Sequence, residues 1–466
     1  MRKTKQGVSL IVLIITIVVM IILASAIMIQ LGKTNIFKKA SDAVNAANLK
    51  EVQTLAALAW SDAYLKYKNE NITIEEKDAK IEEAVNAALV KAGINLNDYN
   101  IKITAKGVTV KVTSLSEITT DGVPIPKGFV KSPYPNEGTK DGGLVIYALT
   151  PAEIKAGKTT ITDSHQTALE TRNQFVWVPV DPNEFETKFK ANCKVVTLGE
   201  AGYWELMLGE DNMPLDNTIN TSNYISPTTL KEATEMYASV KRYGGFYIAR
   251  YEVGTKNLMQ DAKGFRAERV IIKDGSNSKL SITMGKYPYN FVAWGPSMDN
   301  ETSDDGAVSL ARAFYPSSDS RYGVVSTLTY GVQWDRTVAW WKEMNESVNI
   351  ANGVYETTTI ESNEVNSGAK YSEFDGKKFS EWNTLTTKKE SGKWLITTGG
   401  YKNANIYNIY DMAGNLYEWT MQGHSGNTRV RRGGYYGNAV HAGTYSTSGV
   451  PGGSEYMGFR PALYIK

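Results

Sequence analysis

The hydrophobic pattern of this 466-residue chain is unbroken near its start and becomes periodic soon afterwards. No charged residue interrupts residues 8–29, and about 20 apolar residues are enough to cross a bilayer as a helix. Neither glycine nor proline occurs in residues 33–69, where apolar residues recur mostly at three- and four-residue steps. The pattern predicts one long helix over residues 8–68, apolar all round in its inner half and amphipathic in its outer half.

A second helix and a β-hairpin are predicted next. Thr73 has Glu76 three residues later, which is the pattern of a capping box, and Gly93 suits the end of the helix. Apolar and polar residues then alternate over residues 101–112, on both sides of a short turn. With the outer half of the long helix, these elements predict a small head at residues 32–116.

The composition changes after a segment that we expect to be a linker. Residues 117–141 are rich in proline, glycine and threonine. Residues 142–466 are rich in Tyr, Trp, Gly, Asn, Ser and Thr, and short strand-like runs such as 175–178 and 245–251 lie between long loops. The expected fold class is α+β, with a long N-terminal helix and small head followed by a loop-rich α+β domain. Loops this long inside one domain are usually functional or specially packed.

The charges give an orientation and exclude one class of partner. Arg2, Lys3 and Lys5 precede the apolar run, which predicts a cytoplasmic N-terminus and an extracellular remainder. The net charge is only +2 and there is no basic tail, so nucleic acid is not expected as a dedicated partner. The single cysteine, Cys193, excludes an intrachain disulfide. This composition suits a surface that does not depend on disulfides, such as that of a Gram-positive cell.

The first residues resemble a type IV prepilin (class III) signal. Gly7 directly precedes V-S-L-I-V-L-I-I-T-I, after a short basic stretch. The resemblance implies a leader at residues 1–7, removed by a prepilin peptidase between Gly7 and Val8, and N-terminal methylation. It also implies a helix at residues 8–31 that anchors the chain in the membrane and contacts other pilin subunits. A plain signal-anchor is the alternative.

One position departs from the pilin pattern. The family usually has glutamate five residues after the cut, where it meets the free amine of a neighbouring subunit, and this chain has Val12. A charge inside the membrane needs such a partner. The departure favours a minor or tip subunit over a repeating filament subunit.

The region from residue 142 onward carries a second resemblance. Residues 408–420 read N-I-Y-D-M-A-G-N-L-Y-E-W-T and resemble the G-L-x-D-M-x-G-N-V-x-E-W-T signature of formylglycine-generating-enzyme (sulfatase-modifying factor) domains. Residues 429–436 resemble R-V-x-R-G-G-S-W, and residues 458–460 match the closing G-F-R. Similar segments occur upstream at residues 174–180, 247–253 and 328–335, in the same order as in the family. The resemblance implies a C-type-lectin-like α+β fold with little regular structure.

Most of these motif residues predict structural roles. Gly433 and Gly434 suit a backbone that bends sharply or approaches another strand. Arg460 has five donors with which to connect loops. The tryptophans expected to fill the core are Trp334, Trp340, Trp341 and Trp419.

Calcium is a possible cofactor that the resemblance implies. In relatives, oxygen groups around this segment hold calcium, a hard ion that takes several oxygen ligands. Asn415 and Glu418 supply oxygens three residues apart. The alternative is a hydrogen-bond network within the loops.

Enzymatic activity is not expected. The enzymes of the family oxidise a substrate cysteine with paired cysteines near their C-terminus and copper, a chemistry that needs thiolates. This chain has no cysteine after Cys193, and its three histidines, His165, His424 and His441, are too scattered in sequence to indicate a zinc site.

A binding role is the expectation that remains. Residues 432–457 are dominated by Tyr, Ser and Gly, the residues that binding loops of antibodies use for rigid contact and adaptable hydrogen bonds. The candidate ligand-binding residues are Tyr435, Tyr436, Asn438, His441, Tyr445 and Tyr456. The alternative is that these tyrosines pack a loop-rich domain.

The predicted function is a surface-exposed minor or tip pilin-like subunit that presents a non-catalytic adhesion domain to a protein or glycan ligand. It would lie in the cell membrane with its C-terminal domain outside, or in an extracellular pilus. Two alternatives stay open. The head could be purely architectural in a pilus or pseudopilus, or the chain could be a variable receptor of a diversity-generating retroelement, because such receptors also resemble this fold.

Overall fold

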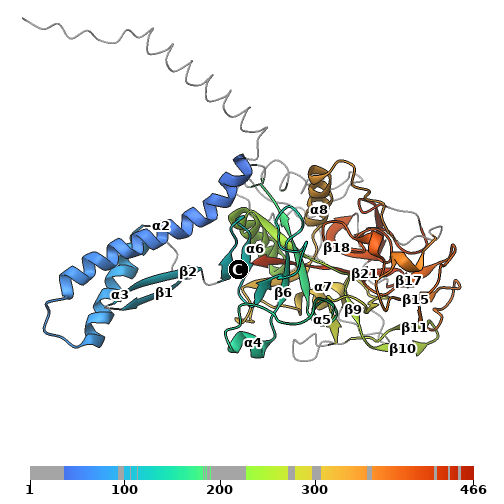
Figure 1. Cartoon of the computed structure of the whole chain (residues 1–466), viewed down its shortest axis with the longest axis horizontal. Helices are drawn as coiled ribbons and strands as arrows, with labels where there is room; N and C mark the ends of the chain where they lie inside the picture. Colours follow the sequence, from blue (N-terminus) through green and yellow to red (C-terminus); the bar gives the residue numbers. More distant parts are fainter. Residues whose placement is uncertain are drawn as a thin grey trace, which may run out of the picture.

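The computed structural model shows an elongated N-terminal part beside a larger C-terminal part (Figure 1). It describes residues 36–92, 99–104, 106–112, 114–181, 183, 185, 189, 227–270, 279–295, 306–353, 359–424, 428–438, 441–449 and 453–466. No helix within these ranges is long and apolar enough to cross a membrane. The predicted leader at 1–7 and apolar helix at 8–31, with Gly7, Val8 and Val12, lie outside the described residues.

The N-terminal part packs two helices against a hairpin. Its elements are α2 (Ile36–Tyr67), α3 (Ile74–Lys91), β1 (Tyr99–Thr104) and β2 (Gly107–Val112). The predicted capping box is confirmed, because the Glu76 amide donates to Thr73 Oγ1 at 3.1 Å and the Thr73 amide donates to Glu76 Oε2 at 2.9 Å. The predicted hairpin is also confirmed, since β1 and β2 pair antiparallel. The core of this part consists of Val52, Ala56, Ala63, Ile81, Val85, Leu89, Ile103 and Val110.

A six-stranded sheet organises the C-terminal part. Its order is β14 (Val324–Leu328), β22 (Pro461–Ile465), β8 (Gly245–Ala249), β7 (Gln174–Pro179), β6 (Val145–Ala148) and β5 (Phe129–Lys131). All neighbouring strands are antiparallel. Every residue of β8, β14 and β22 is buried, which explains why these strands do not alternate between apolar and charged residues.

Short and medium helices surround the sheets, five of them among the described residues. They are α4 (Pro151–Lys155), α5 (His165–Thr171), α6 (Pro227–Tyr243), α7 (Gly306–Arg312) and α8 (Gly331–Met344). Helix α6 packs against β8 and β22, α7 against β14, and α8 against β7 and β18. The described ranges also contain the 3-10 turns η4 (Ser362–Glu364) and η5 (Lys402–Ala404).

The segment expected to be a linker, residues 117–141, contributes to the C-terminal part. It contains the end of β3 (Leu115–Ile118), all of β4 (Pro124–Pro126) and the sheet strand β5. Ile125 and Phe129 are 1% exposed, so the apolar residues between the prolines are core residues. The proline and glycine content of residues 117–141 favoured a linker, although the apolar residues between them occupy core positions.

A second sheet has the order β20-β19-β18-β21. Its strands are β18 (Tyr417–His424), β19 (Thr428–Arg432), β20 (Tyr445–Gly449) and β21 (Met457–Phe459). Strand β21 pairs parallel with β18, and the other pairs are antiparallel. The smaller sheets contain β9 (Gly254–Thr255), β10 (Leu258–Asp261), β11 (Gly264–Ala267), β12 (Leu280–Ser281), β13 (Tyr287–Pro288), β15 (Lys370–Glu373), β16 (Asn383–Thr384) and β17 (Trp394–Ile396).

The structural roles predicted for the motif residues are confirmed. All four motif tryptophans are at most 1% exposed. Gly433 has φ +83°, and a Cβ there would lie 2.6 Å from the Met412 carbonyl oxygen. Arg460 donates to the carbonyls of Ala249 and Tyr410 at 2.8 and 2.7 Å.

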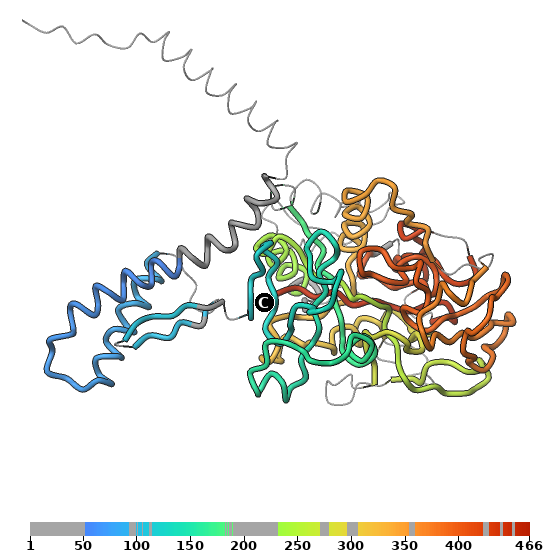
Figure 2. Tube along the Cα trace, viewed as in Figure 1, coloured from blue at the N-terminus to red at the C-terminus, as the bar shows by residue number. Residues whose placement is uncertain are grey.

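The C-terminal strand β22 lies inside the six-stranded sheet, between β14 and β8, rather than at its edge. The red C-terminal strand runs through the middle of the larger part and ends near its junction with the N-terminal part (Figure 2). There the Ser114 hydroxyl donates to the Lys466 carbonyl, and the Lys466 amide donates to the Gly323 carbonyl at 2.9 Å. The last strand therefore joins the start of the C-terminal part to its sheet.

Candidate functional site

Three tyrosines and one arginine form a cluster beside the second sheet. Tyr417 starts β18, Arg431 lies on β19, Tyr435 follows β19, and Tyr456 precedes β21. We call these four residues the tyrosine–arginine cluster. The ring centroids of Tyr417 and Tyr435 are 5.4 Å apart and stacked, and those of Tyr435 and Tyr456 are 4.8 Å apart. These spacings are within the range in which aromatic pairs attract each other.

The Arg431 guanidinium lies over two of these rings. Its central carbon is 4.4 Å from the Tyr417 centroid and 5.1 Å from the Tyr456 centroid. Its other contacts are neutral, to Ser446 Oγ at 3.2 Å and Met457 Sδ at 3.1 Å. Within the described part of the chain no carboxylate forms an ion pair with Arg431. The buried Nε–H of Arg431 has no hydrogen-bond acceptor there either.

The other predicted ligand-binding residues are not gathered around this cluster. Tyr436 is fully buried, and its ring packs against Phe374 and Phe379 with centroids 6.3 and 5.9 Å away. Tyr436 is therefore a core residue with no surface to offer a ligand. Asn438 and His441 are exposed on the loop between β19 and β20.

Tyr445 is exposed but lies on the opposite face of the sheet. It pairs with Arg432 across β19 and β20, whereas Arg431 pairs with Ser446. Neighbouring residues of a strand point to opposite faces. Tyr445 therefore shares its face with Arg432, which is bound to Asp335 and Gln422 at 3.1 and 2.7 Å.

Sequence reasoning identified Tyr435 and Tyr456 but missed Tyr417 and Arg431. Both missed residues lie in motifs that we interpreted as structural, residues 408–420 and 429–436. Alternation along β19 could have placed Arg431 on the opposite face from Arg432. Which residues share that face depends on the pairing of Arg431 with Trp419 on β18. Long-range pairing of this kind is not visible in a single strand.

The described residues that build this sheet match a known family. Residues 227–465, just over half of the chain, match the model described as Sulfatase-modifying factor enzyme 1-like domain. The chain belongs to this family. The match begins at α6, so strands β5–β7 of the six-stranded sheet precede it.

Two solved structures are similar to parts of the chain. Treponema denticola variable protein 1 is 14% identical, and the match covers 47% of this chain and 95% of that one, with a TM-score of 0.22. A structure titled "Crystal Structure of CarF" is 12% identical, with coverage of 64% and 87% and a TM-score of 0.19. No curated protein matches the chain.

The predicted calcium ligands of the sulfatase-modifying-factor domain already have protein partners. Asn415 Oδ1 accepts from the Ile396 amide at 3.0 Å, and its Nδ2 donates to Glu252 Oε2 at 2.8 Å. Both Glu418 oxygens accept from Arg460, at 2.7 and 2.9 Å. In the described ranges no group of three or more His, Cys, Asp or Glu side chains is placed to hold a metal ion. In this structure both side chains belong to a hydrogen-bond network within the protein.

That network contains three carboxyl groups around one guanidinium. Glu252, Asp411, Glu418 and Arg460 are all at most 3% exposed; we call them the carboxylate–arginine network. Burial raises the pKa of Asp411 to about 6 and, with the nearby Asp411 charge, the pKa of Glu418 to about 7. Burial also raises the pKa of Glu252 well above its ordinary value. The single Arg460 guanidinium is shared by three buried carboxyl groups. The network therefore keeps protons at neutral pH that free carboxylic acids would release.

His165 lies apart from both arrangements. His165 Nε2 contacts Glu137 Oε1 at 2.9 Å, and its ring stacks on Tyr134 with centroids 4.4 Å apart. Glu137 also forms an ion pair with the buried Arg250 at 2.7 Å, which supports a structural role for this histidine. Cys193 lies outside the described residues.

Proposed function

We propose that the chain is a surface-displayed, pilin-like minor or tip subunit whose sulfatase-modifying-factor domain binds a ligand without catalysis. The observation that carries the proposal is the tyrosine–arginine cluster. Arg431 is a partly buried cation framed by two tyrosine rings, with no carboxylate partner among the described residues. Buried charges are normally paired, so this cluster suits a ligand that supplies the missing anion.

The chemistry of the cluster favours a ligand with a carboxylate beside a flat or apolar surface. A carboxylate would accept from the terminal N–H groups of Arg431 that its contacts with Met457 and Ser446 leave unused. Hydrogen bonds between a guanidinium and a carboxylate are about twice as strong as neutral ones. Tyr435 and Tyr456 are half-buried, and tyrosine offers large contact area with little loss of side-chain freedom.

The pilin-like part of the proposal is supported by the N-terminal sequence and by the head. The basic stretch, Gly7 and the apolar run provide the resemblance to a prepilin. The head at residues 36–112 has its own apolar core, separate from the two cores of the C-terminal part. A separate core suits a spacer between an anchor and a binding domain. We therefore propose a membrane or pilus location, with prepilin peptidase and other pilin subunits as partners.

A non-catalytic role is supported by the cysteine count. The oxidation performed by the enzymes of this family needs two neighbouring cysteines, as the resemblance implies. This chain has one cysteine, Cys193.

The test replaces Arg431 while keeping the rest of the cluster. Full-length chain carrying Arg431→Gln would be compared with wild type for binding to arrays of acidic peptides and uronic-acid oligosaccharides. Loss of a charge-assisted contact should weaken binding by about tenfold or more. Lys342→Gln, which removes one exposed charge from α8, is the matched control and should bind like wild type.

Two further variants test which face of the second sheet binds the ligand. Tyr456→Leu should weaken binding to the acidic probes, and Tyr445→Ala, on the other face, should not. Export and assembly should be unchanged in all four variants. If Arg431→Gln binds as well as wild type, the cluster is not the ligand site. If no surface variant changes binding while assembly proceeds, the architectural role is the better explanation.

A further inference from the structure

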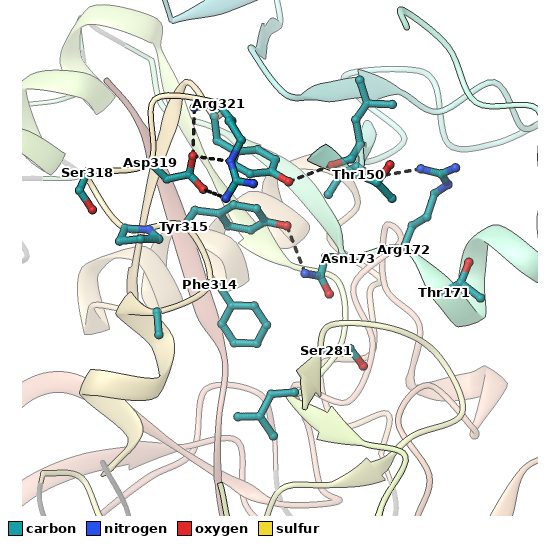
Figure 3. A pocket seen from close by; sticks show the side chains of 16 residues that line it. Thr150, Thr171, Arg172, Asn173, Ser281, Phe314, Tyr315, Ser318, Asp319 and Arg321 are labelled. Carbon is teal, nitrogen blue, oxygen red and sulfur yellow. Dashed lines mark hydrogen bonds and ion pairs between the residues drawn. The ribbon is translucent and has the colours of Figure 1, made fainter. Parts of the chain in front are cut away.

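A hollow of about 830 Å³ lies on the C-terminal part and shares no lining residue with the tyrosine–arginine cluster. It is formed by the end of α5, the strand β12 and the segment that follows α7 (Figure 3). Its volume is in the range of ordinary ligand sites, about 300–1,000 Å³. We call it the α5–α7 hollow and define it by Arg172, Asn173, Ser281, Phe314, Tyr315 and Asp319.

An aromatic ring faces this space. Phe314 is only partly buried, and Figure 3 shows its ring directed into the space near Asn173 and Ser281. The next residue, Tyr315, packs inward instead, with ring centroids 5.1 Å from Phe129 and 4.7 Å from Tyr322. The inward tyrosine holds the segment in place, so the Phe314 ring is presented on a fixed backbone.

Two polar groups beside the ring are held in a fixed orientation. Asn173 Oδ1 accepts from the Ile282 amide at 2.8 Å, and Asn173 Nδ2 donates to the Tyr315 hydroxyl at 3.1 Å. These contacts use one of the two N–H groups of the amide. The Tyr315 hydroxyl accepts in this bond and has no acceptor of its own in the described structure. Burial raises the pKa of Tyr315, so this hydroxyl stays protonated and can donate.

The charged side chains of the hollow are already neutralised. Arg172 binds both oxygens of Glu153 at 2.8 Å and Asp163 at 2.6 Å. Arg321 binds both oxygens of Asp319 at 2.8 and 2.7 Å. Glu153 is also paired with Lys158 at 3.6 Å, so the three carboxylates around the hollow are matched by three cations. An anionic ligand would find no free cation among these residues.

We propose that the α5–α7 hollow binds a neutral sugar unit of a saccharide, with a C–H face of the ring on Phe314 and hydroxyls on Asn173, Tyr315 and Ser281. The aromatic face carries partial negative charge, which attracts the polarised C–H groups of a sugar. Sugar hydroxyls both donate and accept, so they match fixed amide and hydroxyl groups. A peptide strand would instead need a row of unpaired backbone groups, and the nearest strand, β12, has two residues.

The test uses the full-length chain and neutral sugars as probes. Glucose, galactose, mannose and N-acetylglucosamine would be titrated while saturation-transfer NMR and calorimetry are recorded. We expect at least one to bind with a Kd of about 1 mM. Phe314→Leu keeps an apolar side chain but removes the aromatic face, and should weaken binding about tenfold. Tyr315→Phe removes only the hydroxyl and should weaken binding about fivefold.

The controls make this site independent of the proposed function. Tyr456→Leu, in the tyrosine–arginine cluster, should leave sugar binding unchanged, and Phe314→Leu should leave binding of acidic probes unchanged. The proposal is overturned if none of the four sugars binds, if Phe314→Leu binds them as well as wild type, or if glucuronic acid or unstructured peptides bind at this hollow in their place. Circular dichroism of each variant would show that the fold is retained.

Discussion

The carboxylate–arginine network predicts that the C-terminal part loses stability as the pH rises from 4.5 to 7. In this interval the folded protein keeps a proton on Glu418, whose pKa is raised from 4.5 to about 7, while the unfolded chain releases it. The folded state then binds more protons than the unfolded state, so the free energy of unfolding falls with increasing pH. A shift from 4.5 to about 7 corresponds to at most about 3 kcal/mol.

Other carboxyl groups act in the opposite direction at lower pH. Arg172 holds the pKa of Glu153 well below its ordinary value, and the pKa of Glu137 is lowered by Arg250 despite its burial. Their contribution is present above pH 4.5 and is lost as the pH falls further. We therefore expect maximal stability near pH 5, a lower value than is usual for a protein that works at neutral pH.

Thermal unfolding at pH 5 and pH 8, followed by near-UV circular dichroism of the buried tryptophans, measures this effect. At about 2.1 cal/mol/K of unfolding entropy per residue, about 3 kcal/mol corresponds to a decrease in Tm of about 4–5 °C for a domain the size of residues 142–466. Glu418→Gln mimics the protonated side chain at every pH and should reduce the decrease. A Tm that is equal or higher at pH 8, or a decrease that Glu418→Gln leaves unchanged, would refute the reasoning.

Two substitutions test the local structure. Thr73→Ala removes the acceptor for the Glu76 amide and should destabilise α3 by about 1 kcal/mol, seen as faster hydrogen exchange in α3 but not in the C-terminal sheet. Gly433→Ala places a Cβ 2.6 Å from the Met412 carbonyl at φ +83° and should cost at least about 1–3 kcal/mol in thermal unfolding. Gly157→Ala, at φ +67° but with open space around it, is the control and should cost less, because only backbone strain remains.

Features that depend on neighbours in sequence could be predicted well. The capping box of α3 needs only Thr73 and Glu76, and the hairpin needs only alternation around a turn. The family motifs likewise predicted that Trp334 and Trp419 are buried and that Arg460 connects loops. The linker was misjudged because composition was weighed above the spacing of Ile125 and Phe129, whose burial depends on a sheet formed with distant strands.

The candidate site was harder to predict because it depends on which face of a strand each residue occupies. Tyr435 and Tyr436 are adjacent and identical, yet Tyr435 belongs to the tyrosine–arginine cluster and Tyr436 is buried in the core. Tyr445 looked equivalent to Tyr456 by composition, but the pairing of β19 with β20 places it on the other face. A register shift of one residue would exchange these faces, and no local pattern reports the register.

The loops that carry the cluster are attached to the fold at several points, which bears on how it would bind. The Tyr417 amide donates to the Tyr456 carbonyl at 2.8 Å, and the Tyr436 amide donates to the Asn415 carbonyl at 3.0 Å. The Trp334 indole N–H donates to the Ala442 carbonyl at 2.7 Å, which attaches the loop between β19 and β20 to the buried Trp334. Ordering a loop on binding reduces affinity. Because these hydrogen bonds hold the loops before any ligand arrives, a ligand would lose little free energy in ordering them. A domain with short strands and long loops can therefore present a preformed surface.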